Sequence, residues 1–418
     1  MKIVTFINQL GLGGSEKAAG IWARELVNRG HQLHLISFAD GPRRSQFENA
    51  GVSVQILPAH SASIANALSK IQPDAIHAHV PGHAHQGDVL GEALQALPKK
   101  IPILQTNIFG QLENPKENEW TDFRLFISWT SCVQATRRYF KSLDEEFFRR
   151  ASVAVYPLDP DDGPSASERE NFRRLHGIKP DEILFGRLSR PEPNKWTDLA
   201  VDAFRIAAAQ NPHIKLLLRE PPPAVAQSLK GASDCERFIV LPATSDPAEL
   251  ALTTASLDVV LHTSSVGESF GYGIAEPMNY GKPVIANSTP WLDQAQIELV
   301  RHGECGFIAS TASTVAKAIL TLADDVDLRT KLGHNAQSHI RTLSNPSEST
   351  RRLETILEAA VTGASNPNAQ DDLKKARAAG EYLDEQQFGH SPGEQISLRP
   401  KYYWARFHQW RFSRRSRP

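Results

Sequence analysis

Gly267-Glu268-Ser269-Phe270-Gly271-Tyr272-Gly273-Ile274-Ala275-Glu276 is a glycine-rich stretch that carries two glutamates separated by seven residues. The apolar run 257–261 precedes it, and Pro283-Val284-Ile285-Ala286 follows it. Short apolar runs bounded by glycine and proline are typical of buried strands. We therefore predict the order strand, glycine-rich loop, short helix and strand.

The chemistry of this stretch indicates a site for a nucleotide sugar. The free N–H groups at the start of a helix favour an anion such as a phosphate. The carboxylates of Glu268 and Glu276 would repel a phosphate, but they can accept hydrogen bonds from sugar or ribose hydroxyls. The alternative is a buried βαβ unit whose glycines serve only its tight turns.

Length and composition predict a globular chain of two or three domains. With 418 residues, 40% hydrophobic and 22% charged, it can bury sizeable cores. The net charge of −1 neither favours nor excludes a polyanionic partner. Cys132, Cys235 and Cys305 match no metal or redox spacing, and no apolar run reaches the ~18 residues of a membrane span. We expect a cytoplasmic protein.

Short apolar strands alternate with amphipathic helices in both halves, as in doubly wound parallel sheets. We predict a first domain over 1–158, an acidic linker over 159–170 and a second domain over 171–345. Residues 294–343 of the second domain are predicted to be mostly helical, with breaks at Gly303 and Gly306. A helix follows over 346–362, and then a tail over 363–418. The predicted strands are 2–7, 32–38, 53–57, 74–79, 101–105, 125–128 and 151–156, and then 182–186, 215–218, 238–241, 257–261 and 283–286.

The central motif, joined to Gly281-Lys282-Pro283-Val284-Ile285-Ala286, resembles that of the retaining GT-B glycosyltransferases of family 4, the glycosyl transferases group 1. The resemblance implies an α/β fold of two Rossmann-like αβα domains facing a central cleft, with 346–362 crossing back onto the first domain. It implies that Glu268 lies against the donor sugar and that Glu276 binds the ribose hydroxyls. The segment Ser269-Phe270-Gly271-Tyr272 would contact the sugar and the diphosphate.

The implied function is transfer of a hexosyl group from a UDP- or GDP-linked sugar to a saccharide or lipid-linked acceptor, in bacterial surface polysaccharide synthesis. The resemblance implies no cofactor and no metal at the catalytic step. Two other functions stay open. One is a sugar-nucleotide epimerase, and the other is a catalytically silent sugar-binding or scaffold protein.

A basic loop follows the predicted strand 182–186. Arg187, Arg190 and Lys195 stand there, where cations could stabilise the charge of a departing diphosphate. The region resembles the family's arginine and lysine diphosphate site, in which Lys195 matches the lysine and either Arg187 or Arg190 matches the arginine. The alternative is a solvated basic loop.

A second glycine-rich turn, Gly11-Leu12-Gly13-Gly14-Ser15-Glu16, follows the first strand. It departs from the dinucleotide fingerprint because Glu16 replaces the last glycine. It resembles the family's Gly-Gly-x-Glu turn, in which Gly13 and Gly14 would let the backbone approach the donor phosphate. Ser15 could also cap the following helix.

His77, His79, His83 and His85 lie at and beyond the end of strand 74–79. A metal site is weakly indicated, because no carboxylate or thiolate joins them before Asp88. We expect one or two of these histidines, His79 and His83, to lie on the acceptor side together with Asn107, and the others to pack. Asn107 occupies a position where the family often has a histidine beside the donor sugar, and its amide could bind a sugar hydroxyl.

Two further segments give expectations. Asp293 is predicted to cap the helix that follows it. Residues 398–418 interleave aromatic residues with arginines and lack acidic residues. We expect them to contact either an anionic membrane or the first domain, the alternative being a disordered tail.

Overall fold

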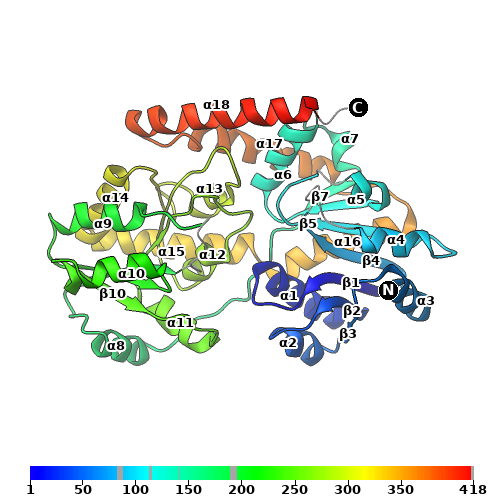
Figure 1. Ribbon diagram of the computed structural model, residues 1–418, viewed down its shortest axis with the longest axis horizontal. Coiled ribbons are helices and arrows are strands. Elements are labelled where there is room, and N and C mark those ends of the chain that lie inside the picture. Colours follow the sequence, from blue (N-terminus) through cyan, green and yellow to red (C-terminus); the bar gives the residue numbers. More distant parts are fainter. Residues whose placement is uncertain (82–87, 113–114, 141, 189–194, 416–418) are drawn as a thin grey trace. The chain divides into compact units, whose positions relative to one another are not determined.

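Parallel βα alternation runs through both halves of the chain, which confirms the predicted α/β fold of two Rossmann-like units (Figure 1). The computed structural model describes residues 1–418 except 82–87, 113–114, 141, 189–194 and 416–418, and it gives only the backbone of 115–117 and 407–415. Unit 1 comprises residues 1–159 and 343–381, and unit 2 comprises 160–342 and 382–418.

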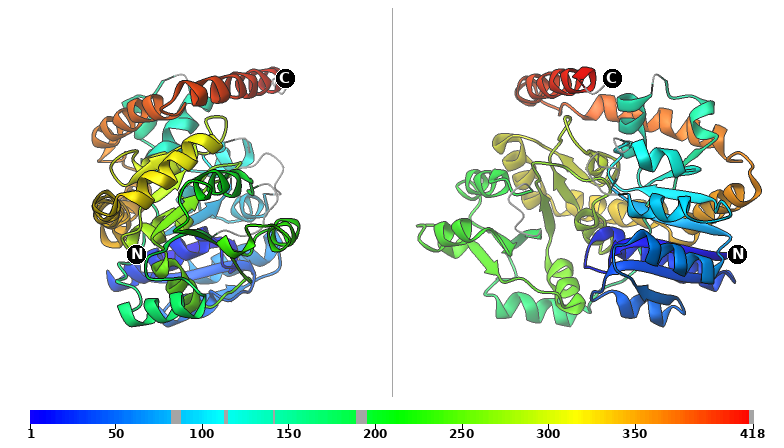
Figure 2. Two further views of the ribbon diagram at one scale, coloured as in Figure 1. Left: turned by 90° about the vertical axis from the view of Figure 1, so that its left-hand side faces the viewer. Right: turned by 45° about the vertical axis from the view of Figure 1, so that its right-hand side comes forward.

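Unit 1 is built on a seven-stranded parallel sheet in the order β3-β2-β1-β4-β5-β6-β7. Helices cover both faces of this sheet, as Figure 2 shows. The strands are β1 Lys2–Gln9, β2 Gln32–Ala39, β3 Ser53–Ile56, β4 Ala75–Val80, β5 Ile103–Asn107, β6 Phe123–Phe126 and β7 Ala151–Val153. The helices are α1 Gly14–Asn28, α2 Arg44–Asn49, α3 Ser61–Ile71, α4 Val89–Gln95, α5 Pro115–Trp120, α6 Trp129–Tyr139, α7 Glu145–Phe148, α16 Pro346–Thr362 and most of α17 Ala369–Gln386.

Unit 2 is built on a six-stranded parallel sheet in the order β10-β9-β8-β11-β12-β13. Its strands are β8 Ile183–Leu188, β9 Ile214–Arg219, β10 Phe238–Leu241, β11 Val259–His262, β12 Val284–Ala286 and β13 Gly306–Ile308. Its helices are α8 Ala166–Leu175, α9 Leu199–Ala208, α10 Pro223–Lys230, α11 Pro247–Ser256, α12 Tyr272–Asn279, α13 Ala295–Val300, α14 Ala312–Asp324, α15 Val326–Leu343 and α18 Pro392–Arg415, with the 3₁₀ helix η1 Cys235–Arg237.

The topology of unit 2 singles out one edge of its sheet. The chain runs outward from β8 to β9 and β10, and then returns to the other side of β8 with β11. Such a reversal leaves a crevice at the carboxyl ends of the two central strands, where ligands of doubly wound sheets bind. The loops after β8 and β11 start at this edge, and they carry the basic loop and the glycine-rich loop of the sequence.

Three boundaries differ from the sequence prediction. The linker ends early, because Ser165 and Glu168 form a capping box that starts α8 at Ala166. A short strand, β13, interrupts the stretch predicted to be mostly helical. Residues 363–418 contain the two long helices α17 and α18 rather than an irregular tail. No helix in the described part of the chain is long and apolar enough to cross a membrane.

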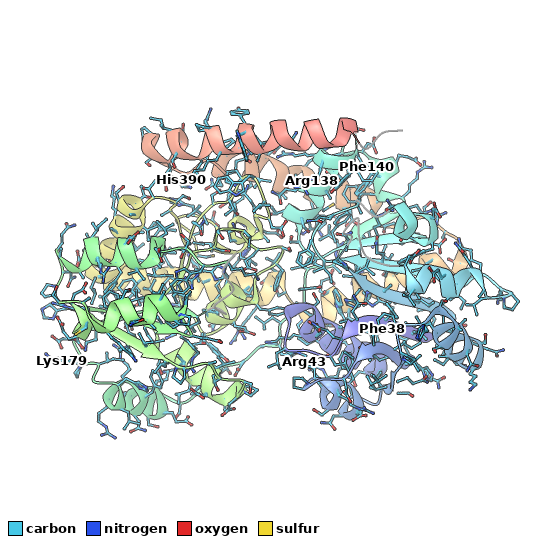
Figure 3. The ribbon with its side chains drawn as sticks, in the orientation of Figure 1. Phe38, Arg43, Arg138, Phe140, Lys179 and His390 are labelled. Carbon is cyan, nitrogen blue, oxygen red and sulfur yellow. The ribbon has the colours of Figure 1, made fainter. Side chains whose placement is uncertain are left out.

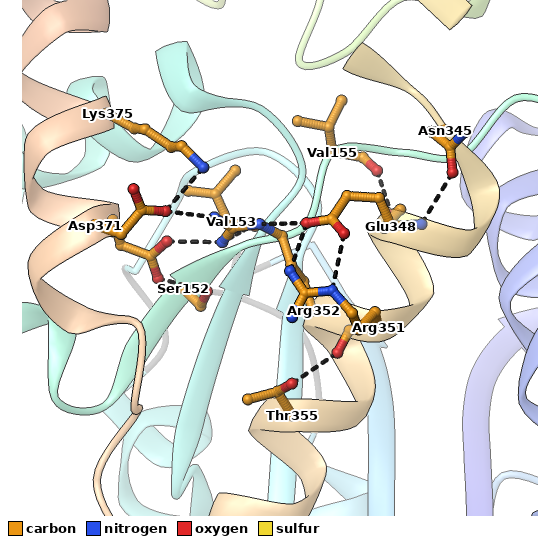
Figure 4. A network of polar contacts seen from close by, with 12 residues as sticks. Ser152, Val153, Val155, Asn345, Glu348, Arg351, Arg352, Thr355, Asp371 and Lys375 are labelled. Atoms are coloured by element: carbon orange, nitrogen blue, oxygen red, sulfur yellow. Dashed lines mark hydrogen bonds and ion pairs between the residues drawn. The ribbon is translucent and has the colours of Figure 1, made fainter. Parts of the chain in front are cut away.

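A buried polar network attaches α16 and α17 to the sheet of unit 1 (Figure 4). The Arg352 guanidinium on α16 lies 2.7 Å from the carboxylate of Asp372 on α17, and both side chains are buried. The other oxygen of Asp372 accepts hydrogen bonds from Ser152 Oγ at 2.7 Å and from Asn366 Nδ2 at 2.9 Å. On α1, Trp22 Nε1 donates to Ser349 Oγ of α16 at 2.9 Å. These bonds satisfy the charges that folding removes from water.

We expect Asp372→Ala to destabilise unit 1 by about 3–5 kcal/mol, because it leaves the Arg352 guanidinium buried without its main partner. Asp371→Ala is the matched control, since this neighbouring carboxylate is 51% exposed although it also contacts Arg352. An exposed pair contributes only about 0–1 kcal/mol. Equilibrium urea unfolding measures both changes. Equal losses in the two variants would contradict the role given to the buried network.

Candidate functional site

At two points in the loop between β11 and α12, the backbone has a conformation that only glycine adopts easily. Gly267 and Gly271 have φ angles of +69° and +100°, in the left-handed region. A Cβ at Gly267 would lie 1.9 Å from the carbonyl oxygen of Asp293, and one at Gly271 would lie 3.1 Å from Cβ and Cγ of Glu268. The two glycines therefore bracket Glu268 and set where its side chain can lie.

Glu268 is held by its backbone and by its carboxylate. Its N–H donates to Gln296 Oε1 at 3.0 Å, and its carbonyl oxygen accepts from the N–H of Ala295 at 2.8 Å. Its carboxylate Oε1 lies 3.1 Å from Nε2 of His262, the last residue of β11. His262 was not among the residues predicted from the sequence. Its signal there is a polar residue at the end of a buried strand, next to a point where the strand order reverses.

A second loop, 287–294, together with Gln296 at the start of α13, supports the first through side-chain amides and hydroxyls. Asn287 pairs with the backbone of Ser264 through both amide atoms, at 2.7 and 2.9 Å. Gln296 Nε2 donates to Thr289 Oγ1 at 2.9 Å, while its Oε1 accepts from Glu268. These bonds fasten the carboxyl ends of β11 and β12 together.

The prediction that Asp293 caps a helix is wrong. Gln294 is the residue that precedes α13, and it makes no side-chain cap. The carboxylate of Asp293 instead accepts a hydrogen bond from the hydroxyl of Ser269. Asp293 therefore helps to hold the glycine-rich loop, because loop 287–294 contacts that loop before α13 begins.

Glu276 lies on α12, one helical turn after Tyr272 and on the same side of the helix. Both side chains are partly buried. The Tyr272 ring packs edge-on against the buried Phe270, with ring centroids 5.0 Å apart. Backbone N–H groups at the start of α12, the Tyr272 ring and the Glu276 carboxylate thus lie near one another on the same side of this helix.

Arg187 is a buried cation at the carboxyl end of β8. Its side chain is 2% exposed, and Nη2 donates to the carbonyl oxygen of Thr263 at 2.8 Å. The guanidinium also lies over the Trp196 ring, 3.8 Å from the centroid. Burial lowers the pKa of Arg187 to about 10, so the group keeps its charge at neutral pH.

Lys195 lies in the same loop region, and its carbonyl oxygen accepts from the N–H of Ser265 at 3.3 Å. The segment around Lys195 is therefore joined to the chain that follows β11. Arg190, the alternative to Arg187, lies outside the described residues. The structure thus brings Arg187, Lys195 and Glu268 to one edge of the unit 2 sheet.

In unit 1, the predicted cap by Ser15 is wrong. Helix α1 begins at Gly14, and Gly13 precedes it without any side-chain cap. A Cβ at Gly13 would lie 2.2 Å from Oε2 of the buried Glu16, so the turn needs glycine to admit that carboxylate.

The structure gives His79 a packing position rather than an open acceptor-side one. His77 and His79 are both 1% exposed, and their ring centroids lie 4.4 Å apart beside Trp22. Burial holds the pKa of His77 well below its usual value and lowers that of His79 to about 3, so both rings are neutral. His77 Nε2 lies 2.6 Å from Thr106 Oγ1. His83 lies outside the described residues.

Asn107 uses its amide to close its own loop. Nδ2 donates to the carbonyl oxygen of Gln111 at 2.6 Å, and Oδ1 accepts from the N–H of Gln111 at 3.1 Å. Asn107 is fully buried. A hydrogen bond to a sugar hydroxyl would have to compete with these two local bonds.

The C-terminal segment of unit 2 touches the loop that supports Glu268, which the sequence did not indicate. Ser288 Oγ lies 2.6 Å from the carbonyl oxygen of Gln387 and 2.7 Å from Gln294 Oε1. Further along, the Lys401 ammonium lies 5.8 Å from the ring centroid of Trp291. The segment after α17 is thus packed against the candidate site's supporting loop.

Comparisons with known proteins agree with this geometry. Residues 168–339 match the family described as glycosyl transferases group 1. D-inositol 3-phosphate glycosyltransferase of Corynebacterium glutamicum (strain R) is 36% identical, over 77% of this chain and 80% of that protein.

Solved structures share the fold at low sequence identity. Anabaena HepE in complex with UDP and glucose superposes with a TM-score of 0.70 at 19% identity, covering 86% of this chain and 100% of that one. The catalytic domain of starch synthase IV from Arabidopsis thaliana, bound to ADP and acarbose, gives 0.63 at 13% identity, covering 86% and 99%. Because a close relative spans most of both chains, this protein belongs to the glycosyl transferases group 1 family and is a glycosyltransferase of GT-B fold.

Proposed function

We propose that the protein transfers a hexosyl group from a nucleoside-diphosphate sugar to a hydroxyl of a saccharide or lipid-linked acceptor, with retention of the anomeric configuration. The observation that carries this proposal is the placement of Glu268 at the switch point of unit 2. There its backbone is fixed by Gln296 and Ala295, and the buried cation Arg187 lies at the carboxyl end of the neighbouring strand β8. Bacterial surface polysaccharide synthesis is the proposed setting.

The charges at this edge suit a donor with an anionic leaving group. Arg187 and Lys195, together with Arg190, would stabilise the diphosphate, whose charge grows as the glycosidic bond breaks. Glu268 would orient the sugar hydroxyls, and Glu276 would accept hydrogen bonds from the ribose. Ser269, Phe270, Gly271 and Tyr272 would line the path between them. Gly13 and Gly14 of unit 1 would bring backbone to the donor phosphate.

Relatives support the classes of donor and acceptor. Anabaena HepE has been solved in complex with UDP-glucose, which supports a nucleotide-sugar donor. The Corynebacterium glutamicum relative is named for D-inositol 3-phosphate, which supports a polyol or sugar hydroxyl as the attacking group.

Retention is proposed to follow from attack on the face that the diphosphate leaves. A double displacement would need a second carboxyl group about 5 Å from the first. Asp293, the acidic residue that the structure places against this loop, is engaged by the Ser269 hydroxyl. We therefore favour a reaction in which the bond from the anomeric carbon to the diphosphate breaks and the bond to the acceptor oxygen forms on the same side. A diphosphate oxygen takes the acceptor proton.

Incubation with UDP- and GDP-linked sugars tests this function. We expect slow release of the nucleoside diphosphate in the absence of acceptor, with the same anomer retained in the freed sugar by NMR. The reaction should persist in EDTA, because arginine and lysine supply the positive charge. An inverted product would contradict retention, interconversion of nucleotide sugars would indicate an epimerase, and binding without turnover would indicate a silent protein.

Glu276→Gln should raise the donor KM more than it lowers kcat. Ribose hydroxyls do not change charge during the reaction, so the loss is mainly one of binding. Initial rates over a range of donor concentrations measure the two constants. Glu236→Gln, at a solvent-exposed position of unit 2, is the control that should leave both unchanged. An unaltered donor KM would remove the ribose role.

Lys195→Ala should lower kcat by at least about 100-fold, because a cation that stabilises developing charge acts mainly in the transition state. Lys230→Ala, on the exposed side of α10, is the matched control and should keep its turnover. Thermal unfolding checks that both variants remain folded. Near-normal turnover of the Lys195 variant would assign the leaving-group charge to the arginines alone.

A further inference from the structure

Positive charge is concentrated at the C-terminal end of the chain. Seven of the 46 lysines and arginines lie in residues 395–418, and none of the 47 aspartates and glutamates does. This segment therefore carries a charge of +7, whereas residues 1–394 carry −8. The net charge of the whole chain is therefore close to zero although its C-terminal end is strongly cationic.

The start of α18 is fixed firmly to unit 2. Glu394 is 1% exposed, and its carboxylate accepts from the N–H of Ser310 at 2.6 Å and from Thr314 Oγ1 at 2.8 Å. It also accepts from the backbone N–H groups of His390 and Ser391, at 2.9 and 3.1 Å. The His390 ring, labelled in Figure 3, stacks on that of His302 with centroids 3.5 Å apart. The start of the helix is thus packed on unit 2.

Two sides of the first half of α18 differ in exposure. Leu398 is buried, and the partly buried Tyr402 packs edge-on against Phe388, with ring centroids 5.3 Å apart. Large apolar side chains elsewhere on this part of the helix face solvent: Ile396 is 75% exposed, Tyr403 61% and Trp404 67%. Helical spacing puts position 407 on the same side as 403, and positions 411 and 415 on the same side as 404.

Segments that bind an anionic bilayer surface typically combine exposed aromatic residues with cationic residues. Trp and Tyr favour the interface between lipid and water, and arginines are attracted to anionic headgroups. Pairing with α18 of a second copy is disfavoured, because both segments carry +7. The charged residues also prevent the helix from spanning a bilayer, so an orientation in the plane of the surface is the one that fits.

We propose that α18 is a membrane-surface helix, which binds anionic lipid through its arginines, Tyr403 and Trp404. Glu394 and Gln387 connect the helix to α14 and to the loop that supports Glu268, all within unit 2. Membrane binding would therefore hold the candidate donor site close to the bilayer. The inference does not rest on the proposed reaction, because lipid binding can be measured without any donor.

Vesicle co-sedimentation of the full chain tests the proposal, using phosphatidylglycerol-containing vesicles and pure phosphatidylcholine vesicles. We expect binding only to the anionic vesicles, with release at about 1 M salt, where the screening length falls to about 3 Å. The triple variant R411Q/R414Q/R415Q should bind at least about 20-fold more weakly, since each arginine near the surface contributes about fivefold. Trp404→Ser should weaken binding by loss of the interfacial aromatic residue.

Matched controls separate this surface from general charge effects. K230Q/K317Q/K331Q removes three exposed cations from other helices of unit 2, and Leu175→Ser removes an apolar side chain that is as exposed as Trp404. Both controls should bind like the wild type, and all variants should keep its unfolding temperature. The proposal is overturned if the wild type does not bind anionic vesicles, if it binds both vesicle types equally, or if the α18 variants bind as tightly as the controls. Self-association that depends on Tyr403 and Trp404, seen by sedimentation without lipid, would also overturn it in favour of a second copy.

Discussion

The hydrogen bonds that join the loop after β11 to the loop after β12 are the interaction on which the candidate site depends. Both loops are rich in polar residues, and neither contains a helix or a strand that would fix its conformation by itself. Gln296 contacts the backbone of Glu268 and the hydroxyl of Thr289, and Asn287 closes onto Ser264. Buried amides whose oxygen and nitrogen are both hydrogen-bonded fix the backbone on each side of a functional carboxylate, and here they fix the backbone at Glu268.

Electrostatics at this edge of the sheet follow from burial. Burial removes the Arg187 guanidinium from water and lowers its pKa. The carbonyl oxygen of Thr263 and the face of the Trp196 ring replace part of the lost hydration. A cation that is already desolvated interacts more strongly with an incoming phosphate than an exposed one does. The chain therefore places a charge where the topology of the sheet leaves a crevice, and not on an exposed loop.

The C-terminal segment extends the same unit outward. Residues 382–402 are packed on unit 2 by a buried carboxylate, a stacked histidine pair and a contact with Ser288. Through Ser288 and Gln294 this packing reaches the loop that supports Glu268. The start of α18 and the loop that supports Glu268 thus belong to one packed unit, although residues 382–402 lie outside the family's matched residues 168–339.

The sequence by itself determined the class of fold and the position of the glycine-rich loop, because both depend on local patterns. Alternating apolar runs predict parallel strands, and Gly267 and Gly271 were needed where the backbone has positive φ. Only the tertiary structure decided which partners hold Glu268 and its neighbour Ser269. His262 and Gln296 contact Glu268, Asp293 contacts Ser269, and the three come from separate segments that meet at one sheet edge. It also decided that His79 is buried and that Asn107 closes its own loop, because a strand-end residue can face a ligand or the core with the same sequence spacing. The attachment of α17 and α18 was equally hidden, because it rests on long-range contacts of Asp372 and Glu394. The start of α18 itself has a local signal, since Ser391 and Glu394 form a capping box.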